Sequence, residues 1–490
     1  MYNIGIFFKE ANFEYDVHSL VKSFYPESQI KMYSQENLLE KEHTQVHDLC
    51  FFISCQENLI MVEGKNGRKS LKKEQEIHGD FARKEIKNIM KRLLYDILSE
   101  MTGTSLLWGT LSGIRPTKIA MKLLEEGKAR ESVFSQMKKD YLLSDKKANL
   151  CIDIAQRERE ILQGIDYQNG YSLYVGIPFC PTICLYCSFS SYPLGRYEKM
   201  VDTYLDALCK EIDYVAAMNR DKNLDTIYIG GGTPTTLNAN QLRRLFQKIA
   251  DVFDCSKVKE YTVEAGRPDS IDFDKLQAIS EFPISRISVN PQTMNQKTLD
   301  LIGRKHSVED TIKSYELARS LGFDNINMDL IVGLPGETKE DIENTLFWMK
   351  KLSPDSLTVH SLAVKRAARL NIFKDVYKEM SYENNQEIID LTMKCAKEMD
   401  MFPYYLYRQK NMKGNLENVG YAKVDKAGIY NILIMEEKQT IWALGAGAST
   451  KIVSHGGEKI TRIENVKDVG LYIEKIDEMI LRKKNSMLSC

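Results

Sequence analysis

Short apolar runs alternate with helix-length amphipathic segments through the middle of the chain, from about residue 171 onward. This alternation indicates repeated β-α units, which form a parallel sheet with right-handed crossovers. Six such units are too few to close an eight-stranded barrel, so the pattern predicts an α/β fold built on a partial (β/α)6 barrel. The predicted strands are Leu173–Val175, Thr226–Ile229, Tyr261–Val263, Ile284–Val289, Ile326–Ile331 and Ser356–Val359.

The chain before this barrel follows two other patterns. Leu49–Ile53 and Leu59–Val62 are apolar runs on either side of a polar stretch, which is typical of a strand pair. Apolar residues then recur at helical spacing up to the start of the barrel. We therefore expect an N-terminal α/β segment of unknown role at residues 1–80 and a mostly helical connector at residues 81–165.

The last part of the chain mixes helical and strand-like patterns. One helix is predicted near 382–400 and a closing helix near 465–483, with strand-like pieces between them. We assign residues 166–365 to the barrel, in which six units leave a gap. We therefore expect residues 366–490 to form a C-terminal α+β domain that caps this open side and covers the substrate.

Composition and charge are those of an ordinary globular protein. Lys and Arg number 67 and Asp and Glu 68, for a net charge of −1, and 43% of residues are hydrophobic. These values exclude a disordered chain and give no global reason to bind nucleic acid or an anionic membrane. No stretch approaches the roughly 18 apolar residues of a membrane-spanning helix, and no basic region of a signal peptide precedes Lys9. We expect a cytoplasmic protein with no membrane span and no nucleic-acid partner, whose 10 cysteines are not paired as disulfides.

Three of the cysteines follow the first predicted barrel strand with C-x3-C-x2-C spacing: Cys180, Cys184 and Cys187. Thiolates at this spacing suit zinc or an iron–sulfur cluster. A structural zinc usually takes four protein ligands, and no fourth Cys or His follows nearby. Three ligands to a four-iron cluster would leave one iron open to a substrate or cofactor.

Other chemically distinctive residues also fall at the ends of predicted strands, where barrel enzymes gather their functional groups. Gly230–Gly232 follows the second strand and lets a ligand approach the backbone closely, although a simple turn explains the glycines equally well. Glu264 ends the third strand and suits ribose hydroxyls or an ammonium group, or a salt bridge at the rim. His360 ends the sixth strand, where a buried structural histidine is the alternative to a catalytic one.

Together these motifs resemble the radical S-adenosylmethionine (SAM) superfamily. The wider pattern is similar to the oxygen-independent coproporphyrinogen III oxidase group and fits its HemZ-like branch best, over about residues 171–450. The stretches that carry the resemblance are Tyr174–Cys180, Gly230–Thr235, Thr262–Ala265, Arg286–Thr293, Ile302–His306, Asn327–Gly336, Leu406–Met412 and Ala443–Ala448.

The resemblance implies a cofactor set, a reaction and a set of site residues. The three cysteines would hold a [4Fe–4S] cluster, and SAM would chelate its open iron and be cleaved to a 5′-deoxyadenosyl radical. The radical would abstract hydrogen from propionate side chains of coproporphyrinogen III, giving vinyl groups and protoporphyrinogen IX in haem biosynthesis, with an electron donor such as flavodoxin or ferredoxin. The residues that would contact SAM are Tyr174, Tyr186, Gly231, Gly232, Thr233, Glu264, Gln292, Arg304 and Asp329.

The chain departs from the oxidases of this group at two positions. Gly176 stands where they carry His, and Phe189 stands where they carry a further Cys that is not a cluster ligand, so the catalytic residues remain unassigned. Cations that could bind substrate propionates, or could be ordinary surface charge, are Lys365, Arg366, Arg408 and Lys410.

Two alternative functions stay open. Haem chaperones in this group carry His-Asn-x-x-Tyr-Trp, whereas the nearest stretch here, Glu417–Ala422, lacks both the His and the Trp. A radical SAM enzyme that modifies haem itself is the other alternative. An oxidase consumes SAM as vinyl groups form, whereas a chaperone binds haem without needing to do so.

Overall fold

The computed structural model describes residues 1–10, 12–34, 47–56, 58–67, 69–113, 115–189, 191–365, 368–373, 383–409, 416–457 and 459–487. The chain groups by its internal contacts into two compact units, Met1–Gln156 with Arg408–Asn415, and Arg157–Tyr407 with Leu416–Cys490. Their boundaries are not those of the four predicted segments, because residues 157–165 and most of residues 366–490 fall in the same unit as the barrel.

The first unit is built on a five-stranded sheet in the order β2-β1-β3-β4-β5. Its hairpin of β3 and β4 is the strand pair expected from the apolar runs. Alternate residues of β1, Ile4, Ile6 and Phe8, face a core completed by α1 and α2. The strands are β1 (Asn3–Phe8), β2 (Gln29–Tyr33), β3 (Leu49–Gln56), β4 (Leu59–Asn66) and β5 (Lys69–Glu76), and the helices are α1 (Glu14–Phe24), α2 (Arg83–Thr102), α3 (Thr117–Glu125), α4 (Arg130–Tyr141) and α5 (Asp145–Ile161), whose last turn lies beyond the unit boundary.

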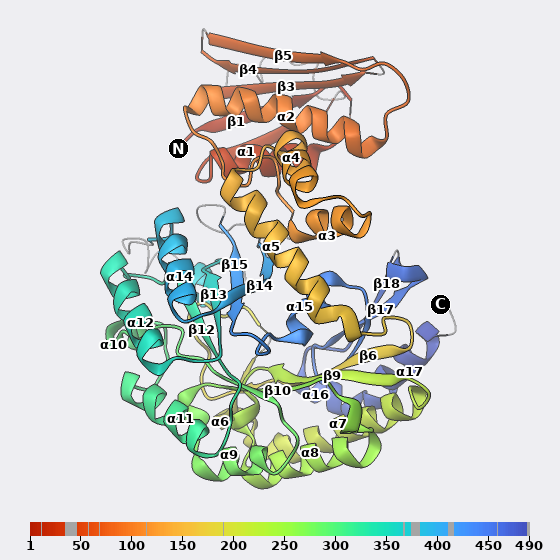
Figure 1. The fold of residues 1–490 in the computed structure, drawn as a ribbon, viewed down its shortest axis with the longest axis vertical. Helices are drawn as coiled ribbons and strands as arrows, with labels where there is room; N and C mark the ends of the chain where they lie inside the picture. The colour runs from red at the N-terminus through yellow and green to blue at the C-terminus, as the bar shows by residue number, and fades with distance from the viewer. Residues whose placement is uncertain are drawn as a thin grey trace. The chain divides into compact units, whose positions relative to one another are not determined.

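The second unit contains the predicted partial barrel. All six predicted strands form and pair in parallel in chain order, and Figure 1 shows the helices of the β-α units as an outer ring around them. The strands are β6 (Gly170–Ile177), β9 (Asn223–Gly231), β10 (Glu260–Gly266), β11 (Arg286–Val289), β12 (Ile326–Val332) and β13 (Ser356–Ser361). The helices are α7 (Val201–Met218), α8 (Ala239–Val252), α9 (Phe273–Ser280), α10 (Gln296–Leu301), α11 (Val308–Ser320) and α12 (Lys339–Leu352).

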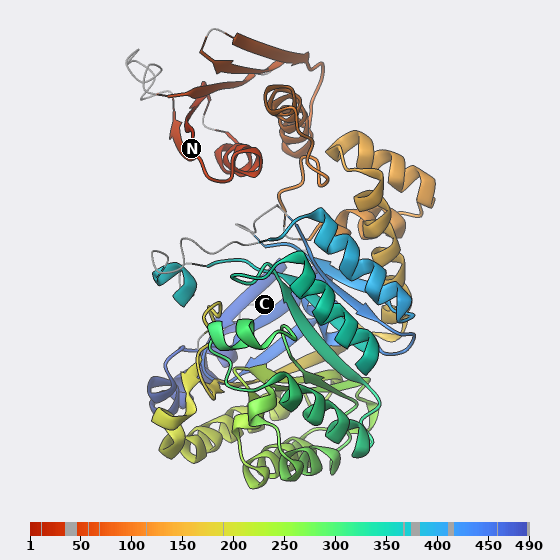
Figure 2. The same ribbon diagram turned by 90° about the vertical axis from the view of Figure 1, so that its left-hand side faces the viewer.

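The C-terminal region adds strands to both edges of this sheet. β15 pairs antiparallel with β13 and with β14, whereas β16 pairs parallel with β6 and leads into β17 and β18 (Figure 2). The result is an eleven-stranded sheet among the described residues, and the physical reason is that an unpaired edge strand exposes backbone groups that need partners. The elements are α14 (Gln386–Glu398), β14 (Phe402–Tyr407), β15 (Asn418–Ala422), α15 (Ile429–Glu436), β16 (Thr440–Leu444), β17 (Ser449–Ser454), β18 (Lys459–Glu464), α16 (Val469–Glu474) and α17 (Ile476–Met487).

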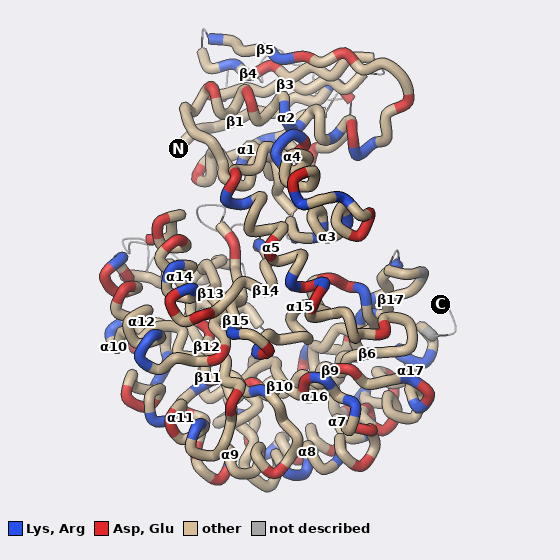
Figure 3. Tube along the Cα trace, in the orientation of Figure 1, with Lys and Arg blue, Asp and Glu red and all other residues tan. Residues whose placement is uncertain are grey.

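The outer helices of the barrel carry both signs of charge, interspersed along α7, α8 and α11 (Figure 3). Arg243 of α8 pairs with Glu281 at 2.7 Å, and Arg244 pairs with Asp206 of α7. These exposed pairs contribute little individually but match the balanced net charge. None of the described helices is long and apolar enough to cross a membrane.

A buried polar network joins the C-terminal helices to the barrel through Glu211 of α7. Its Oε1 accepts a hydrogen bond from Lys483 Nζ at 2.7 Å, and its Oε2 accepts from Tyr472 Oη at 2.6 Å and from the Gly445 amide at 2.9 Å. Asn465 also donates to Glu211, and the side chains of Lys483 and Glu211 are 0% exposed. Since a buried charge without its partner is very costly, the network fixes α17 and the segment after β16 to the barrel.

Replacing Lys483 by Met should therefore lower the free energy of unfolding by about 3–5 kcal/mol, because Glu211 is left buried without its counter-charge. Urea denaturation followed by circular dichroism measures the change. Lys484, the exposed neighbour on the same helix, provides the control, and Lys484→Met should change stability by less than about 0.5 kcal/mol. Equal effects of the two substitutions would show that the buried pair does not stabilise the fold.

Candidate functional site

The cysteine loop begins on β7 (Phe179–Cys180), directly after β6, at the end of the barrel where the parallel strands finish. Cys180 and Cys184 are buried and Cys187 is half-buried. Two hydrogen bonds hold the loop against the segment after α10: the Leu185 amide donates to Ile302 O at 2.9 Å, and Thr182 Oγ1 donates to Gly303 O at 3.0 Å. The barrel therefore fixes the loop on both sides.

The glycine run after β9 makes room for this loop. Gly231 has a φ of +110°, which a residue with a side chain rarely adopts. The Gly232 amide donates to Ile177 O at 2.7 Å, and a Cβ on Gly232 would lie 2.5 Å from Phe179 O and 3.0 Å from Cys180 Sγ. The close approach of two backbones therefore excludes a side chain at position 232, and it places the glycine run against the cysteine loop.

The environment of the thiols suits a metal–sulfur centre. Burial raises the pKa of Cys180 to about 11, although Thr233 Oγ1 donates a hydrogen bond to its sulfur at 3.6 Å, and burial also raises the pKa of Cys187. A metal that binds these sulfurs would displace their protons, because the thiolate is the ligand form. Among the described residues no three His, Cys, Asp or Glu side chains converge as ligands of one ion. A four-iron cluster does not require this, because each of the three thiolates would bind a different iron.

A cavity of about 360 Å³ lies beside the cysteine loop. Its walls include three residues expected to contact SAM, Tyr174, Gly231 and Glu264. The ring of Tyr174 stacks against Tyr430 of α15 with centroids 6.3 Å apart, and Tyr430 stacks on Tyr228 of β9 at 4.5 Å. Neither Tyr228 nor Tyr430 was predicted from the sequence as part of the site. Tyr228 lies two residues before Gly230 on β9 and therefore on the same face of the strand, so the strand period could have identified it. Tyr430 lies on α15, about 200 residues later in the chain, and no local pattern links it to the site.

The two carboxyl groups at the strand ends have opposite electrostatic environments. Burial raises the pKa of Glu264 to about 7, although Tyr228 Oη donates a hydrogen bond to it. Burial also acts to raise the pKa of Asp329, but His360, whose Nε2 lies 3.8 Å away, and Asn327, which donates at 2.7 Å, lower it on balance. Glu264 and Asp329 both line a second cavity, of about 180 Å³, in which one is readily protonated and the other stays ionised.

The segment after β11 carries polar atoms without partners among the described residues. Gln292 has a φ of +67°, which is strained for a residue with a side chain, and its buried Oε1 accepts no hydrogen bond. The backbone amide of Gln292 donates to the backbone carbonyl oxygen of Asp329 at 2.9 Å, so the two residues are neighbours. Arg304 donates to Pro291 O at 3.2 Å, while its buried Nε has no acceptor. Such unpaired buried groups are expected where a polar ligand completes the site.

Not every residue singled out in the sequence lines these cavities. Tyr186 packs beside the apolar cluster that contains Leu185 and Ile302, under the cysteine loop. Arg408 belongs to the first unit, where it donates to Leu111 O at 2.6 Å and lies over the Trp108 ring. The other two candidate cations, Arg366 and Lys410, lie outside the described residues.

The two positions that depart from the oxidase pattern both line the larger cavity. A Cβ on Gly176 would lie 3.2 Å from Leu444 O, because β16 pairs closely with β6 there. Phe189 is 72% exposed and carries the Lys365 ammonium 5.8 Å above its ring. The cavity mouth is therefore open, aromatic and cationic where the oxidases carry a thiol.

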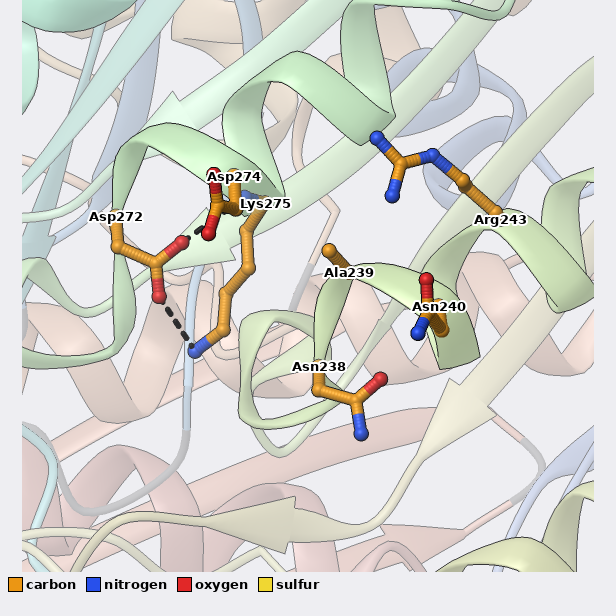
Figure 4. Close-up of a pocket in the computed structure, with 7 residues that line it drawn as sticks. All are labelled: Asn238, Ala239, Asn240, Arg243, Asp272, Asp274 and Lys275. Carbon is orange, nitrogen blue, oxygen red and sulfur yellow. Dashed lines mark hydrogen bonds and ion pairs between the residues drawn. The ribbon is translucent and has the colours of Figure 1, made fainter.

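A third pocket lies between the N-termini of α8 and α9, on the outer ring of helices (Figure 4). Its polar groups are already engaged: Asn238 caps α8, Asp272 caps α9, and Arg243 forms two bonds of 2.7 Å to Glu281. Three of its polar side chains therefore already stabilise the helices around the pocket.

Comparison with known proteins places this geometry in a family. Residues 174–349 match the model of the radical SAM superfamily. The oxygen-independent coproporphyrinogen-III oxidase-like protein HemZ of Bacillus subtilis is 42% identical over 398 residues, which are 80% of this chain and 79% of HemZ. The chain belongs to the radical SAM family of HemZ-like coproporphyrinogen III oxidase relatives.

Two other members of this radical SAM family bear on the function. The haem chaperone HemW of B. subtilis is 33% identical over 63% of this chain and 76% of its own. Among solved structures, the coproporphyrinogen III oxidase HemN of Escherichia coli, a radical SAM enzyme, matches with a TM-score of 0.52 and 25% identity, covering 66% of this chain and 73% of HemN. As a radical SAM protein, the chain uses a [4Fe–4S] cluster and SAM, which agrees with its buried thiols, glycine cradle and unpaired polar atoms.

The contact between Gly232 and the start of the cysteine loop predicts that a side chain at position 232 weakens cluster binding. In Gly232→Ala, the new Cβ would press on Phe179 O and Cys180 Sγ and displace the cysteine loop. Strain of about 1–3 kcal/mol would weaken cluster retention by about 5- to 150-fold. Release of iron to a chelator under anaerobic conditions measures it. Gly195→Ala, whose Cβ meets no atom within 4 Å, should behave as wild type, and normal iron retention in both variants would contradict the prediction.

Proposed function

We propose that this protein is a SAM-dependent coproporphyrinogen III dehydrogenase that converts propionate side chains to vinyl groups, giving protoporphyrinogen IX. The observation that carries the proposal is the juxtaposition of cysteine loop and cavity mouth, where Phe189 offers an exposed aromatic face two residues after Cys187. Lys365 lies over that face and Lys467 lines the same cavity. An apolar macrocycle bearing carboxylates fits an aromatic surface flanked by cations. The extended similarity to HemZ supports the same reaction.

In this proposal Cys180, Cys184 and Cys187 hold the cluster, and the predicted contact residues bind SAM. When bound, the cluster and SAM would supply a carbon-centred radical able to remove hydrogen from the propionate. Loss of CO2 and transfer of one electron to a one-electron acceptor would then leave a vinyl group. The ionised carboxylate of Asp329 suits a cationic or hydroxyl group of SAM, and Gln292 Oε1 is an acceptor awaiting a donor. The tyrosine stack around Tyr174 gives the cavity an apolar wall that excludes water.

The C-terminal region contributes to the same cavities, which supports the proposal that residues 366–490 help to cover the substrate. Ala446, Gly447 and Ala448 line the larger cavity, and Tyr405 and Tyr407 line the smaller one. We further propose an external one-electron donor such as a flavodoxin or ferredoxin, a cytoplasmic location and no nucleic-acid partner.

A haem chaperone is the competing function, since HemW is also similar to this chain. The stretch that corresponds to the chaperone motif forms β15, whose five residues are all buried and pair with β13 and β14. A strand paired on both sides does not present a haem ligand to solvent, which favours the oxidase.

The test is anaerobic incubation of the reconstituted protein with SAM, a low-potential reductant and coproporphyrinogen III, read by mass spectrometry. We expect 5′-deoxyadenosine and CO2 in step with vinyl formation, and no turnover after Cys184→Ala. Cys209→Ala, at a half-buried cysteine of α7 outside the loop, is the matched control and should remain active.

Other outcomes of this test would replace the proposal. Stoichiometric haem binding without vinyl product would identify a chaperone. Consumption of SAM only when haem is present would identify a haem-modifying enzyme.

The proposed role of Glu264 predicts a pH dependence of SAM binding. With a pKa of about 7, Glu264 is protonated below that pH and accepts hydrogen bonds best above it, as a carboxylate. SAM affinity should therefore rise as the pH rises through 7, by up to about tenfold per pH unit below the pKa, and level off above it. Equilibrium binding to the reconstituted protein measures this.

Glu264→Gln is the control, because an amide does not titrate in this range. Its pH dependence should lose the part due to Glu264 and keep any part due to SAM itself. A wild-type pH slope in this variant would show that Glu264 does not contact SAM.

A further inference from the structure

The guanidinium of Arg267 lies directly behind the cysteine loop. Arg267 follows β10 and is 3% exposed. Its Nη1 lies 2.9 Å from both Thr182 O and Thr182 Oγ1, and 3.5 Å from Cys184 Sγ. One buried cation thus binds both the chain between two of the cysteines and the sulfur of one of them.

The other side of the guanidinium is fixed by Asp269. Arg267 Nε and Nη2 donate to the two carboxylate oxygens of Asp269 at 2.9 and 2.6 Å, a bidentate geometry that locks the plane of the group. His306 Nδ1 lies 3.7 Å from the same carboxylate. The Arg267 carbonyl accepts from Ser270 Oγ at 2.7 Å, so the turn that carries the pair is itself braced. The Nη1 donor is therefore preorganised toward the loop rather than free to rotate away.

We propose that Arg267 is a positioning residue for the cluster that raises its reduction potential by donating a hydrogen bond to the Cys184 sulfur. Adding an electron increases the negative charge on the cluster and its thiolates, and a charged N–H donor stabilises that charge more in the reduced than in the oxidised state. Because the site is buried, the interaction is weakly screened. This inference rests on the cluster and not on the identity of the substrate.

The test is an EPR-monitored redox titration of the full-length reconstituted holoprotein. In Arg267→Gln the charged donor is lost, and we expect the equilibrium constant for one-electron reduction to fall about tenfold, equivalent to a midpoint about 59 mV more negative. Arg267→Lys, which keeps the charge but not the fork, should give a smaller shift in the same direction. Arg243→Gln removes an arginine of the outer helix α8 that is likewise bidentate to a carboxylate, the exposed Glu281, and it should leave the potential unchanged.

Iron and sulfide content of each variant separates tuning from assembly. A wild-type potential in Arg267→Gln with a full cluster would overturn the proposal. If that variant fails to hold the cluster, the potential of Arg267→Lys decides, and a wild-type value there would also overturn it. Loss of the cluster from both variants would replace tuning by a role in assembly.

Discussion

The close approach of two backbones at the end of β6 is the constraint on which the site depends. The Gly232 amide donates to Ile177 O and the Thr233 amide donates to Phe179 O, each at 2.7 Å. These bonds attach the turn after β9 to the segment that leads into the cysteine loop. The contact is possible only because Gly232 has no Cβ and Gly231 tolerates its positive φ. Parallel pairing of β6 and β9 places the ends of the two strands side by side. The two hydrogen bonds then fix the position of Cys180 relative to the turn after β9.

The C-terminal strands complete the same site from the other edge of the sheet. Pairing of β16 with β6 brings Leu444 O against Gly176. The turn after β16 is held by Glu211, which accepts from the Gly445 amide, and by Tyr204, whose Oη accepts from the Ala446 amide at 3.2 Å and donates to Gly176 O at 2.6 Å. Glycine at position 176 is thus accounted for by packing.

The sequence predicted the parts of this molecule that depend on local pattern. The six barrel strands, the hairpin of β3 and β4 and the terminal helices follow from hydrophobic periodicity, and the radical SAM family follows from cysteine and glycine spacing. Features that depend on contacts distant in sequence were not predictable: the C-terminal strands at both sheet edges, the stacking of Tyr430 on Tyr228, and Arg267 behind Cys184. Arg408 illustrates the same limit, since its place in a motif did not reveal that it belongs to the first unit.

The two carboxyl groups of the barrel show how one buried site can supply two protonation states. Glu264 and Asp329 share a cavity, yet burial dominates at Glu264, whereas His360 and Asn327 compensate for it at Asp329. Two ionised carboxylates so close would repel each other, and the pKa of Glu264 is raised partly by Asp329. Asp329 is therefore ionised at neutral pH, whereas the protonation of Glu264 can change with its surroundings. Such an arrangement costs less to bury than two fixed charges, because only one carboxylate has to keep its charge in the buried site.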